Sequence, residues 1–110
     1  MTGAERAQQT WQVLIGAAHN RQTLTYDILE DMTGMFSAGF GPILDRIAAY
    51  CSRKGLPPLT VLVVGKNTGR PGTGYKSPTG DEAADRESVY AERWYRLSPP
   101  QVSDFEAEAS

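Results

Sequence analysis

The residues whose types are best suited to binding a ligand lie in a glycine-rich, positively charged segment. Residues 65–76 read GKNTGRPGTGYK and follow directly on an apolar stretch, residues 59–64, which read LTVLVV. The cations of this segment are Lys66, Arg70 and Lys76. Glycine-rich loops that follow a strand bind phosphate through their backbone N–H groups when the spacing is right. Three interpretations are open: a nucleotide-phosphate cradle, a charged hairpin that touches nucleic acid, or a surface loop without a function.

The spacing of this segment argues against both common nucleotide-binding patterns. A P-loop places Ser or Thr directly after its Gly-Lys pair, but Asn67 follows Gly65 and Lys66 here. A dinucleotide fingerprint that begins at Gly72 requires glycine at a position that Ser77 occupies. The sequence therefore favours the other two interpretations and predicts no nucleotide cofactor.

The chain also lacks the residue combinations that enzymes and metal sites use. His19 is the one histidine and Cys51 the one cysteine, so neither a zinc site nor an internal disulfide is expected. The neighbouring acids Glu30 and Asp31 point to different sides of a helix, and no nucleophile has a recognisable base. We expect His19 to end a helix and Cys51 to be a small core residue. The sequence predicts a protein that is not an enzyme and binds no cofactor or metal.

Length and composition are typical of one modest domain. The chain has 110 residues, of which 40% are hydrophobic and 22% charged, as in ordinary globular proteins. No apolar run is long enough to cross a membrane, and the polar N-terminus does not resemble a signal peptide, so a cytoplasmic location is expected. Residues 1–97 form the predicted domain, and residues 98–110, with two prolines and three acids, are predicted to be an acidic, disordered tail.

The net charge of −2 hides an uneven distribution. Residues 1–80 carry eight Lys or Arg and five Asp or Glu, whereas residues 81–110 carry three Arg and eight acids. The first part therefore has a charge of +3 and the second a charge of −5. A basic body suits an anionic partner such as nucleic acid, although acidic ends are equally typical of solubilising tails.

Hydrophobic spacing and cap residues predict four helices and a few short strands. The expected elements, in chain order, are a helix over 4–18, a strand over 23–25, a helix over 26–33, a helix over 43–54, a strand over 59–64, a return strand within 70–76 and a helix over 81–97. Thr25 is expected to cap the second helix, and Gly34 to end it. Ile28, Leu29 and Met32 supply its apolar face. Pro42 is expected at the first position of the third helix.

This order of elements predicts an α+β fold, the winged helix-turn-helix: a three-helix core, a small antiparallel β-hairpin as the wing, and an additional C-terminal helix. In such domains the third helix enters the major groove and the wing lies along phosphates. Helix 43–54 and loop 65–76 would take these roles in a non-enzymatic protein that binds double-stranded DNA, such as a transcriptional regulator, and a homodimer would suit a two-fold site. The candidate nucleic-acid-binding residues are Arg21, Thr25, Arg46, Tyr50, Arg53, Lys54, Lys66, Asn67, Arg70 and Lys76.

Two stretches resemble known sequences. Residues 21–35, RQTLTYDILEDMTGM, resemble the opening of a winged-helix unit in the DNA-binding half of alkylguanine-DNA alkyltransferases and alkyltransferase-like proteins. The matching residues are Thr23, Thr25, Tyr26 and Ile28. That family's Pro-Cys-His-Arg motif is absent, so the resemblance implies DNA binding without alkyl transfer. Residues 50–75 resemble an LPPLTxLVVxxxTGxPGxG signature of small uncharacterised bacterial and phage proteins, which implies a genuine folding unit but no activity.

A protein-interaction or inhibitor module on the same scaffold is the alternative function. The acidic end, residues 81–110, can imitate nucleic acid or dock on a basic surface of a partner. Exposed aromatic side chains would favour this alternative, and the candidates are Tyr75, Tyr90 and Tyr95. On the helix predicted to read DNA, Asp45 stands next to Arg46, which weakens the case for DNA.

Overall fold

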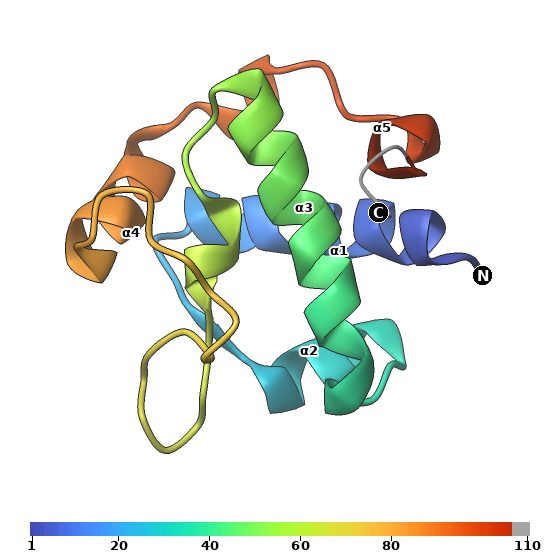
Figure 1. Ribbon diagram of the computed structural model, residues 1–110, viewed down its shortest axis with the longest axis horizontal. Coiled ribbons are helices and arrows are strands. Elements are labelled where there is room, and N and C mark those ends of the chain that lie inside the picture. Colours follow the sequence, from blue (N-terminus) through green and yellow to red (C-terminus); the bar gives the residue numbers. More distant parts are fainter. Residues whose placement is uncertain (107–110) are drawn as a thin grey trace.

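The computed structural model describes residues 1–106 and shows a mostly helical protein built on two long helices (Figure 1). Helix α1 (Gly3–His19) crosses behind helix α3 (Phe40–Lys54) in this view. The remaining elements are β1 (Leu24–Thr25), α2 (Tyr26–Thr33), the 3₁₀ turn η1 (Ser37–Gly39), η2 (Leu59–Leu62), β2 (Val63–Val64), α4 (Glu82–Ala91), η3 (Trp94–Arg96) and α5 (Val102–Glu106). No helix within residues 1–106 is long and apolar enough to cross a membrane.

The first helix forms where the sequence predicts one and is one residue longer at each end. The Thr2 hydroxyl accepts a hydrogen bond from the Glu5 N–H at 3.1 Å, and the Glu5 carboxylate accepts one from the Thr2 N–H at 2.8 Å. This reciprocal capping box satisfies two backbone donors that the helix itself leaves unpaired. Trp11, Leu14 and Ala18 then bury one face of α1 in the core.

Cap residues define α2 and α3 largely as the sequence predicts. Thr25 Oγ1 accepts a hydrogen bond from the Ile28 N–H at 3.4 Å, and Gly34 ends α2 in the left-handed conformation with φ of 74°. Gly55 ends α3 in the same way, with φ of 67°. Helix α3 begins two residues before Pro42. A proline is tolerated there because the N–H groups of the first turn have no partner within the helix.

The predicted antiparallel hairpin is wrong, because the sheet consists of two short parallel strands. β1 and β2 pair with Leu24 opposite Val63 and Thr25 opposite Val64. Residues 59–62, which the sequence assigns to a strand, coil into η2 and are buried. Only two residues of the apolar stretch therefore remain extended.

The expected return strand fails for a local reason. One antiparallel bridge joins Val64 to Pro71, beside a hydrogen bond from the Gly65 N–H to the Arg70 carbonyl at 2.9 Å. Pro71 has no N–H with which to continue a ladder, so the chain closes a loop instead (yellow in Figure 1). The winged helix-turn-helix prediction is thus corrected to a small α-rich fold with a parallel strand pair.

The core centres on Trp11 of α1. Its ring centroid lies 5.3 Å from that of Tyr50, 5.5 Å from that of Trp94 and 6.1 Å from that of Phe105. Tyr50 and Phe105 also contact each other, at 5.3 Å. Edge-to-face aromatic pairs stabilise by about 0.5–1.5 kcal/mol beyond the burial of their area. This cluster joins α1, α3, η3 and α5 into one body.

The described part of the expected tail is packed against this body. Phe105 in α5 is fully buried, and the Pro100 carbonyl accepts a hydrogen bond from Gln8 Nε2 at 3.2 Å. Residues 98–106 therefore depart from the disorder that the prolines and acids suggest, because one phenylalanine fills the space beside Trp11 and Tyr50. The last four residues of the predicted tail lie outside the described residues.

The last predicted helix is shorter than expected. Asp81 caps α4, with its carboxylate accepting hydrogen bonds from the N–H groups of Ala83 and Ala84 at 3.0 and 3.2 Å. The helix stops at Ala91 and the chain turns into η3. This break places the Trp94 indole where its N–H donates to the Val89 carbonyl at 2.8 Å while its ring is buried.

Candidate interaction surfaces

The face of α3 that the sequence predicts to read DNA is covered by α5. Tyr50 is only 7% exposed and packs against Phe105. Arg46 Nη1 donates a hydrogen bond to the Phe105 carbonyl at 2.8 Å. Arg53 Nη2 donates to the Asp104 carbonyl at 3.2 Å, and its guanidinium lies 5.5 Å from the Tyr50 ring centroid. Burial and the Asp104 charge raise the pKa of Tyr50. These candidates therefore hold α5 in place, and the expected exposure of Tyr50 is corrected.

Two cations of the glycine-rich loop lie beside carboxylates of other elements. Lys66 Nζ is 3.8 Å from the Asp27 carboxylate on α2. The Arg70 guanidinium donates to both carboxylate oxygens of Glu82 on α4, at 3.1 and 3.4 Å, and this contact raises the pKa of Arg70. A phosphate backbone would compete with these carboxylates for the same cations. The other candidates of this loop are exposed, namely Asn67 and Lys76.

The glycines of this loop serve its own turns and packing. Gly69 has a φ of 65°, in the left-handed region that favours glycine. A Cβ on Gly72 would stand 2.9 Å from the Tyr26 hydroxyl of α2. The close approach that glycine allows here is thus to a neighbouring helix of the same chain.

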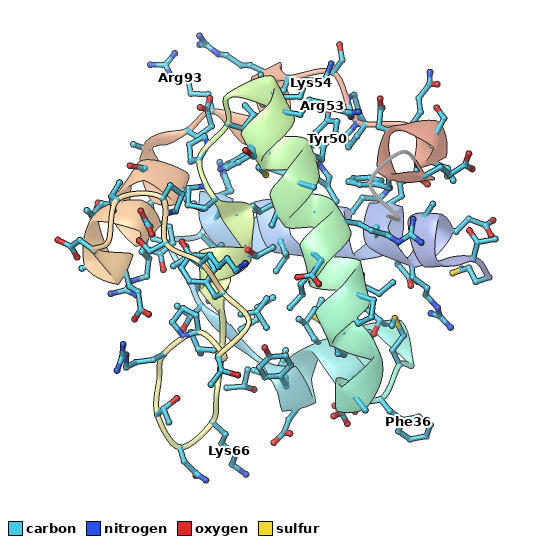
Figure 2. The ribbon with its side chains drawn as sticks, viewed as in Figure 1. Phe36, Tyr50, Arg53, Lys54, Lys66 and Arg93 are labelled. Carbon is cyan, nitrogen blue, oxygen red and sulfur yellow. The ribbon has the colours of Figure 1, made fainter. Side chains whose placement is uncertain are left out.

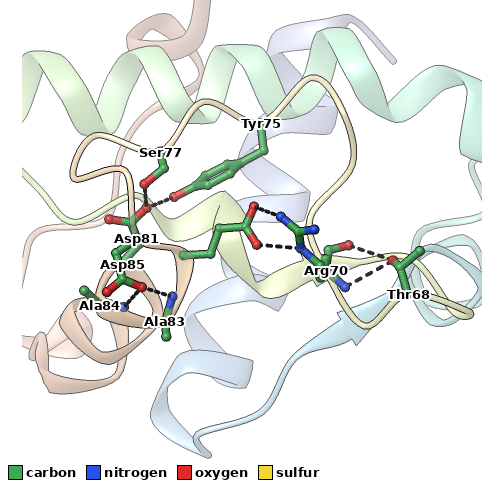
Figure 3. Close-up of polar contacts among 9 residues, drawn as sticks. Thr68, Arg70, Tyr75, Ser77, Asp81, Ala83, Ala84 and Asp85 are labelled. Carbon is green, nitrogen blue, oxygen red and sulfur yellow. Dashed lines mark hydrogen bonds and ion pairs between the residues drawn. The ribbon is translucent and has the colours of Figure 1, made fainter.

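A buried carboxylate fixes the end of the loop on α4. Asp85 is 1% exposed and accepts hydrogen bonds from the hydroxyls of Tyr75 and Thr79, each at 2.7 Å, and from the Ser77 hydroxyl. Figure 3 shows the contacts of Tyr75 and Ser77. Burial alone would raise the pKa of Asp85, but the hydrogen bonds from Ser77, Thr79 and Tyr75 outweigh it and lower that pKa. Each hydroxyl is used to satisfy the carboxylate, so this cluster, the Asp85 clasp, anchors the loop.

The two candidates next to α2 also have partners within the fold. Arg21 Nη2 donates to both carboxylate oxygens of Glu87 at 2.8 and 2.9 Å, and its guanidinium lies 4.9 Å from the Tyr90 ring centroid. Thr25 caps α2. The structure therefore does not bring the ten predicted residues together as one surface.

The surface of the protein at the C-terminal end of α3 is basic, and we call it the basic end. It consists of the exposed cations Lys54, Arg93 and Arg96. Figure 2 shows Lys54 and Arg93 at this end of the molecule. The end of α3 and the turn η3 lie near each other because Tyr50 and Trp94 both pack on Trp11. The sequence-based list includes Lys54 but neither arginine.

The lone cysteine and the lone histidine each pack against other parts of the fold. Burial raises the pKa of the Cys51 thiol to about 11, so it stays protonated at neutral pH. His19 lies against Tyr95, with ring centroids 5.5 Å apart. Within residues 1–106 no three His, Cys, Asp or Glu side chains gather in a geometry for a metal ion.

Exposed apolar side chains gather around α2. Ile28 and Met32, one turn apart, are 44% and 57% exposed, and Phe36 just beyond the helix is 84% exposed. Figure 2 shows Phe36 pointing away from the body at the end of the molecule where α2 lies. Among residues 1–106 the other exposed large apolar side chains are Met1 and Tyr95. Apolar side chains exposed together mark interaction sites more often than isolated ones do.

An open groove lies beside Met32. Its lining residues are Gln12, Val13, Gly16, Ala17, Asn20, Gln22, Leu24 and Met32. On the α1 side, Gly16 has no side chain and Ala17 is buried in the core. The Tyr95 hydroxyl lies 3.6 Å from the position that a Cβ on Gly16 would take, so this exposed ring also borders the groove. We call the groove together with Ile28, Met32 and Phe36 the α1–α2 surface.

Comparisons with known proteins identify no relative for this chain. No protein-family model, curated protein or solved structure matches it. The resemblances to alkyltransferase-like proteins and to small bacterial and phage proteins stay predictions that rest on their motifs. The function is therefore argued from the surfaces of this molecule.

Sequence reasoning missed the α1–α2 surface because it grouped Ile28 and Met32 with Leu29 as one apolar face of their helix. The structure buries Leu29 and Thr33 instead, and the Thr33 hydroxyl donates to the Leu29 carbonyl at 2.7 Å. This internal hydrogen bond lets a threonine take a core position. A helix of eight residues has two adjacent apolar stripes here, and the sequence alone does not show which one is covered.

Proposed function

We propose that the protein is a non-enzymatic protein-interaction domain that binds an amphipathic helix of a partner protein on the α1–α2 surface. The observation that carries this proposal is the exposure of Ile28 and Met32, one turn apart, beside an apolar groove. Complete burial of such a side chain stabilises by about 1.5–3 kcal/mol. Ile28 and Met32 are already about half covered, so burying the rest of each side chain against a partner would contribute only part of that free energy.

The shape of the surface suits a helix. Gly16 places no side chain in the groove, and the side-chain atom nearest to it there is the Tyr95 hydroxyl. Met32 and Leu24 line the same groove and provide contacts for anchors that repeat every three or four residues. The aromatic ring of Tyr95 adds a further apolar contact with a hydroxyl at its tip.

DNA binding is the second candidate function, and the basic end favours it. Lys54, Arg93 and Arg96 are exposed cations on neighbouring elements, and such groups bind phosphates without reading bases. Reading the major groove with α3 is not part of this proposal, because α5 covers that helix face. For either candidate function we propose a cytoplasmic location, which agrees with the single, buried cysteine.

The test of the first candidate uses a defined peptide, because the partner is unidentified. The probe is a fluorescein-labelled helical peptide of about 18 residues, or five turns, with leucines on one face and equal numbers of Lys and Glu on the other. We expect its anisotropy to rise on titration with the protein. Gly16→Leu, which fills the groove, should lower the affinity about tenfold, or 1.4 kcal/mol.

The matched control adds the same side chain outside the groove. Ala84 is exposed on α4, so Ala84→Leu should leave peptide affinity unchanged. An equal affinity of the unmodified protein and Gly16→Leu would contradict the proposal. Titration of a random-sequence duplex at about 50 and about 200 mM salt tests the second candidate, because phosphate contacts predict a steep loss of affinity with salt.

A further inference from the structure

We infer that the helix bound at the α1–α2 surface is basic, with Lys or Arg side chains flanking its apolar stripe on the side that meets α2. This inference rests on the proposed function and names the chemistry of the partner. The observation behind it is the arrangement of charges around α2, which is independent of the apolar contacts of the surface.

Two exposed stripes run side by side along α2. Residues four apart lie on one line of a helix, so Ile28 and Met32 form one stripe and Asp27 and Asp31 form the next, about 100° further round. All four side chains are exposed. The apolar stripe therefore lies between the core-facing residues of α2 and a line of carboxylates.

The charge of this helix is one-sided. Its acids are Asp27, Glu30 and Asp31, and it contains no Lys or Arg. Lys66 lies 3.8 Å from Asp27, and Arg6 Nη1 donates to the Thr33 carbonyl at 2.8 Å. The Asp31 carboxylate is exposed, and no ion pair within residues 1–106 engages it.

The nearby lysine does not neutralise the surface firmly. The Lys66 and Asp27 side chains are 75% and 63% exposed, and exposed ion pairs of this kind stabilise a protein only slightly. A cationic side chain of a partner can therefore displace Lys66 from Asp27 with little loss of free energy. Asp31 offers a second carboxylate one turn away, which matches cations spaced by three or four residues on a docked helix.

Charge complementarity of this kind selects partners and speeds their association. A basic amphipathic helix buries its apolar stripe on Met32 and the groove while its cations reach Asp27 and Asp31. An acidic helix of the same shape places like charges together, which is unfavourable. The same carboxylates repel nucleic acid from this surface, so duplex DNA is not the occupant that we infer here.

The experiment compares two labelled peptides that share a leucine face and differ only on the other face, one with Lys and one with Glu. At about 50 mM salt, where screening is weak, we expect the Lys peptide to bind about tenfold more tightly than the Glu peptide. Asp27→Asn/Asp31→Asn should reduce that preference to about twofold, since each exposed pair contributes below about 1 kcal/mol.

The matched control removes the same net charge elsewhere. Asp45 on α3 and Glu106 on α5 are exposed, so Asp45→Asn/Glu106→Gln should keep the full preference. Equal affinities of both peptides, each lowered by Gly16→Leu, would overturn the inference and leave the proposed function standing. Insensitivity of both peptides to Gly16→Leu would overturn the proposed function itself. Thermal unfolding of each variant, Gly16→Leu included, checks that it remains folded.

Discussion

Helices α2 and α3 each present a stripe that sequence patterns describe incorrectly, and in opposite directions. On α3 the stripe with Arg46, Tyr50 and Arg53 is expected to face solvent, yet α5 covers it. On α2 the predicted apolar face joins Ile28 and Met32 to Leu29, yet Leu29 is buried whereas Ile28 and Met32 are exposed. The contrast shows that periodicity gives the stripes of a helix, whereas distant segments decide which stripe is covered.

The two helices also differ in how their polar groups are used. The arginines on α3 donate to backbone carbonyls of α5, so they act as internal ties. Within residues 1–106, the ion pair of the α2 aspartates is the contact of Asp27 with the exposed Lys66 at 3.8 Å. An interface therefore fits the acidic and apolar side of α2 better than the basic side of α3.

The largest effect is expected from uncovering α3. Phe105→Ala removes a fully buried ring that contacts Trp11 and Tyr50. Deleting a buried phenylalanine typically costs about 3–5 kcal/mol, and urea unfolding measures this loss. Val102→Ala on the same helix is the control, because Val102 is only partly buried, and its loss should be smaller. A loss below about 1 kcal/mol for Phe105→Ala would mean that α5 does not cover α3.

The next effect concerns the Asp85 clasp, which holds the loop that brings Lys66 toward α2. Asp85→Asn removes a buried charge that accepts three hydrogen bonds from hydroxyls. We expect a loss of about 1.5–3 kcal/mol, the usual contribution of a hydrogen bond to a charged group. Urea unfolding at neutral pH provides the measurement, and unchanged stability would contradict the anchoring role.

The clasp also predicts a pH dependence. The pKa of Asp85 is lower in the folded chain than its ordinary value, so the unfolded chain binds the proton more readily. The Asp85 carboxylate therefore contributes fully to the free energy of unfolding above the ordinary carboxyl pKa of about 4. This contribution is lost as the pH falls through the lower pKa that Asp85 has in the folded chain. Unfolding between about pH 5 and 2 should show a steeper loss of stability for the unmodified protein than for Asp85→Asn. Parallel curves would contradict this assignment.

A smaller effect is expected on α2, and it should appear in binding rather than in stability. Met32→Ser changes a side chain that is 57% exposed, so unfolding should shift by about 0.5 kcal/mol or less. Affinity for the mixed-charge peptide should fall about five- to tenfold, as for a moderate contact residue. Anisotropy measures the affinity. A large loss of stability would show that Met32 belongs to the core, as its sequence pattern suggests.

The smallest effect tests the floor of the groove. Gly16→Ala adds a Cβ that would lie 3.6 Å from the Tyr95 hydroxyl, an ordinary contact. Alanine in a helix interior is favoured over glycine by about 0.5–1 kcal/mol, so thermal unfolding should shift upward. Gly34→Ala provides the contrast, because φ of 74° at Gly34 strains alanine and should lower stability. A loss of stability in Gly16→Ala would mean that the groove is closed by packing.

The parts of this fold that sequence predicts well are those set by local chemistry. The helix over 4–18, the Thr25 cap and the Gly34 and Gly55 stops depend on residues within a few positions of one another. The parts that it misses depend on contacts far along the chain. Phe105 covers Tyr50 across more than fifty residues, and the parallel pairing of β1 with β2 joins Leu24 to Val63, which is also distant along the chain.

The central claim is that the α1–α2 surface binds a helix, and backbone amide shifts in ¹H–¹⁵N NMR spectra test it most directly. The isotope-labelled protein is titrated with the leucine–lysine peptide. The account predicts that shifts concentrate in residues 12–36, including Gly16 and Met32, while the end of α3 and α5 stay unchanged. Shifts centred on α3 and α5, or no saturable shifts at all, would contradict it.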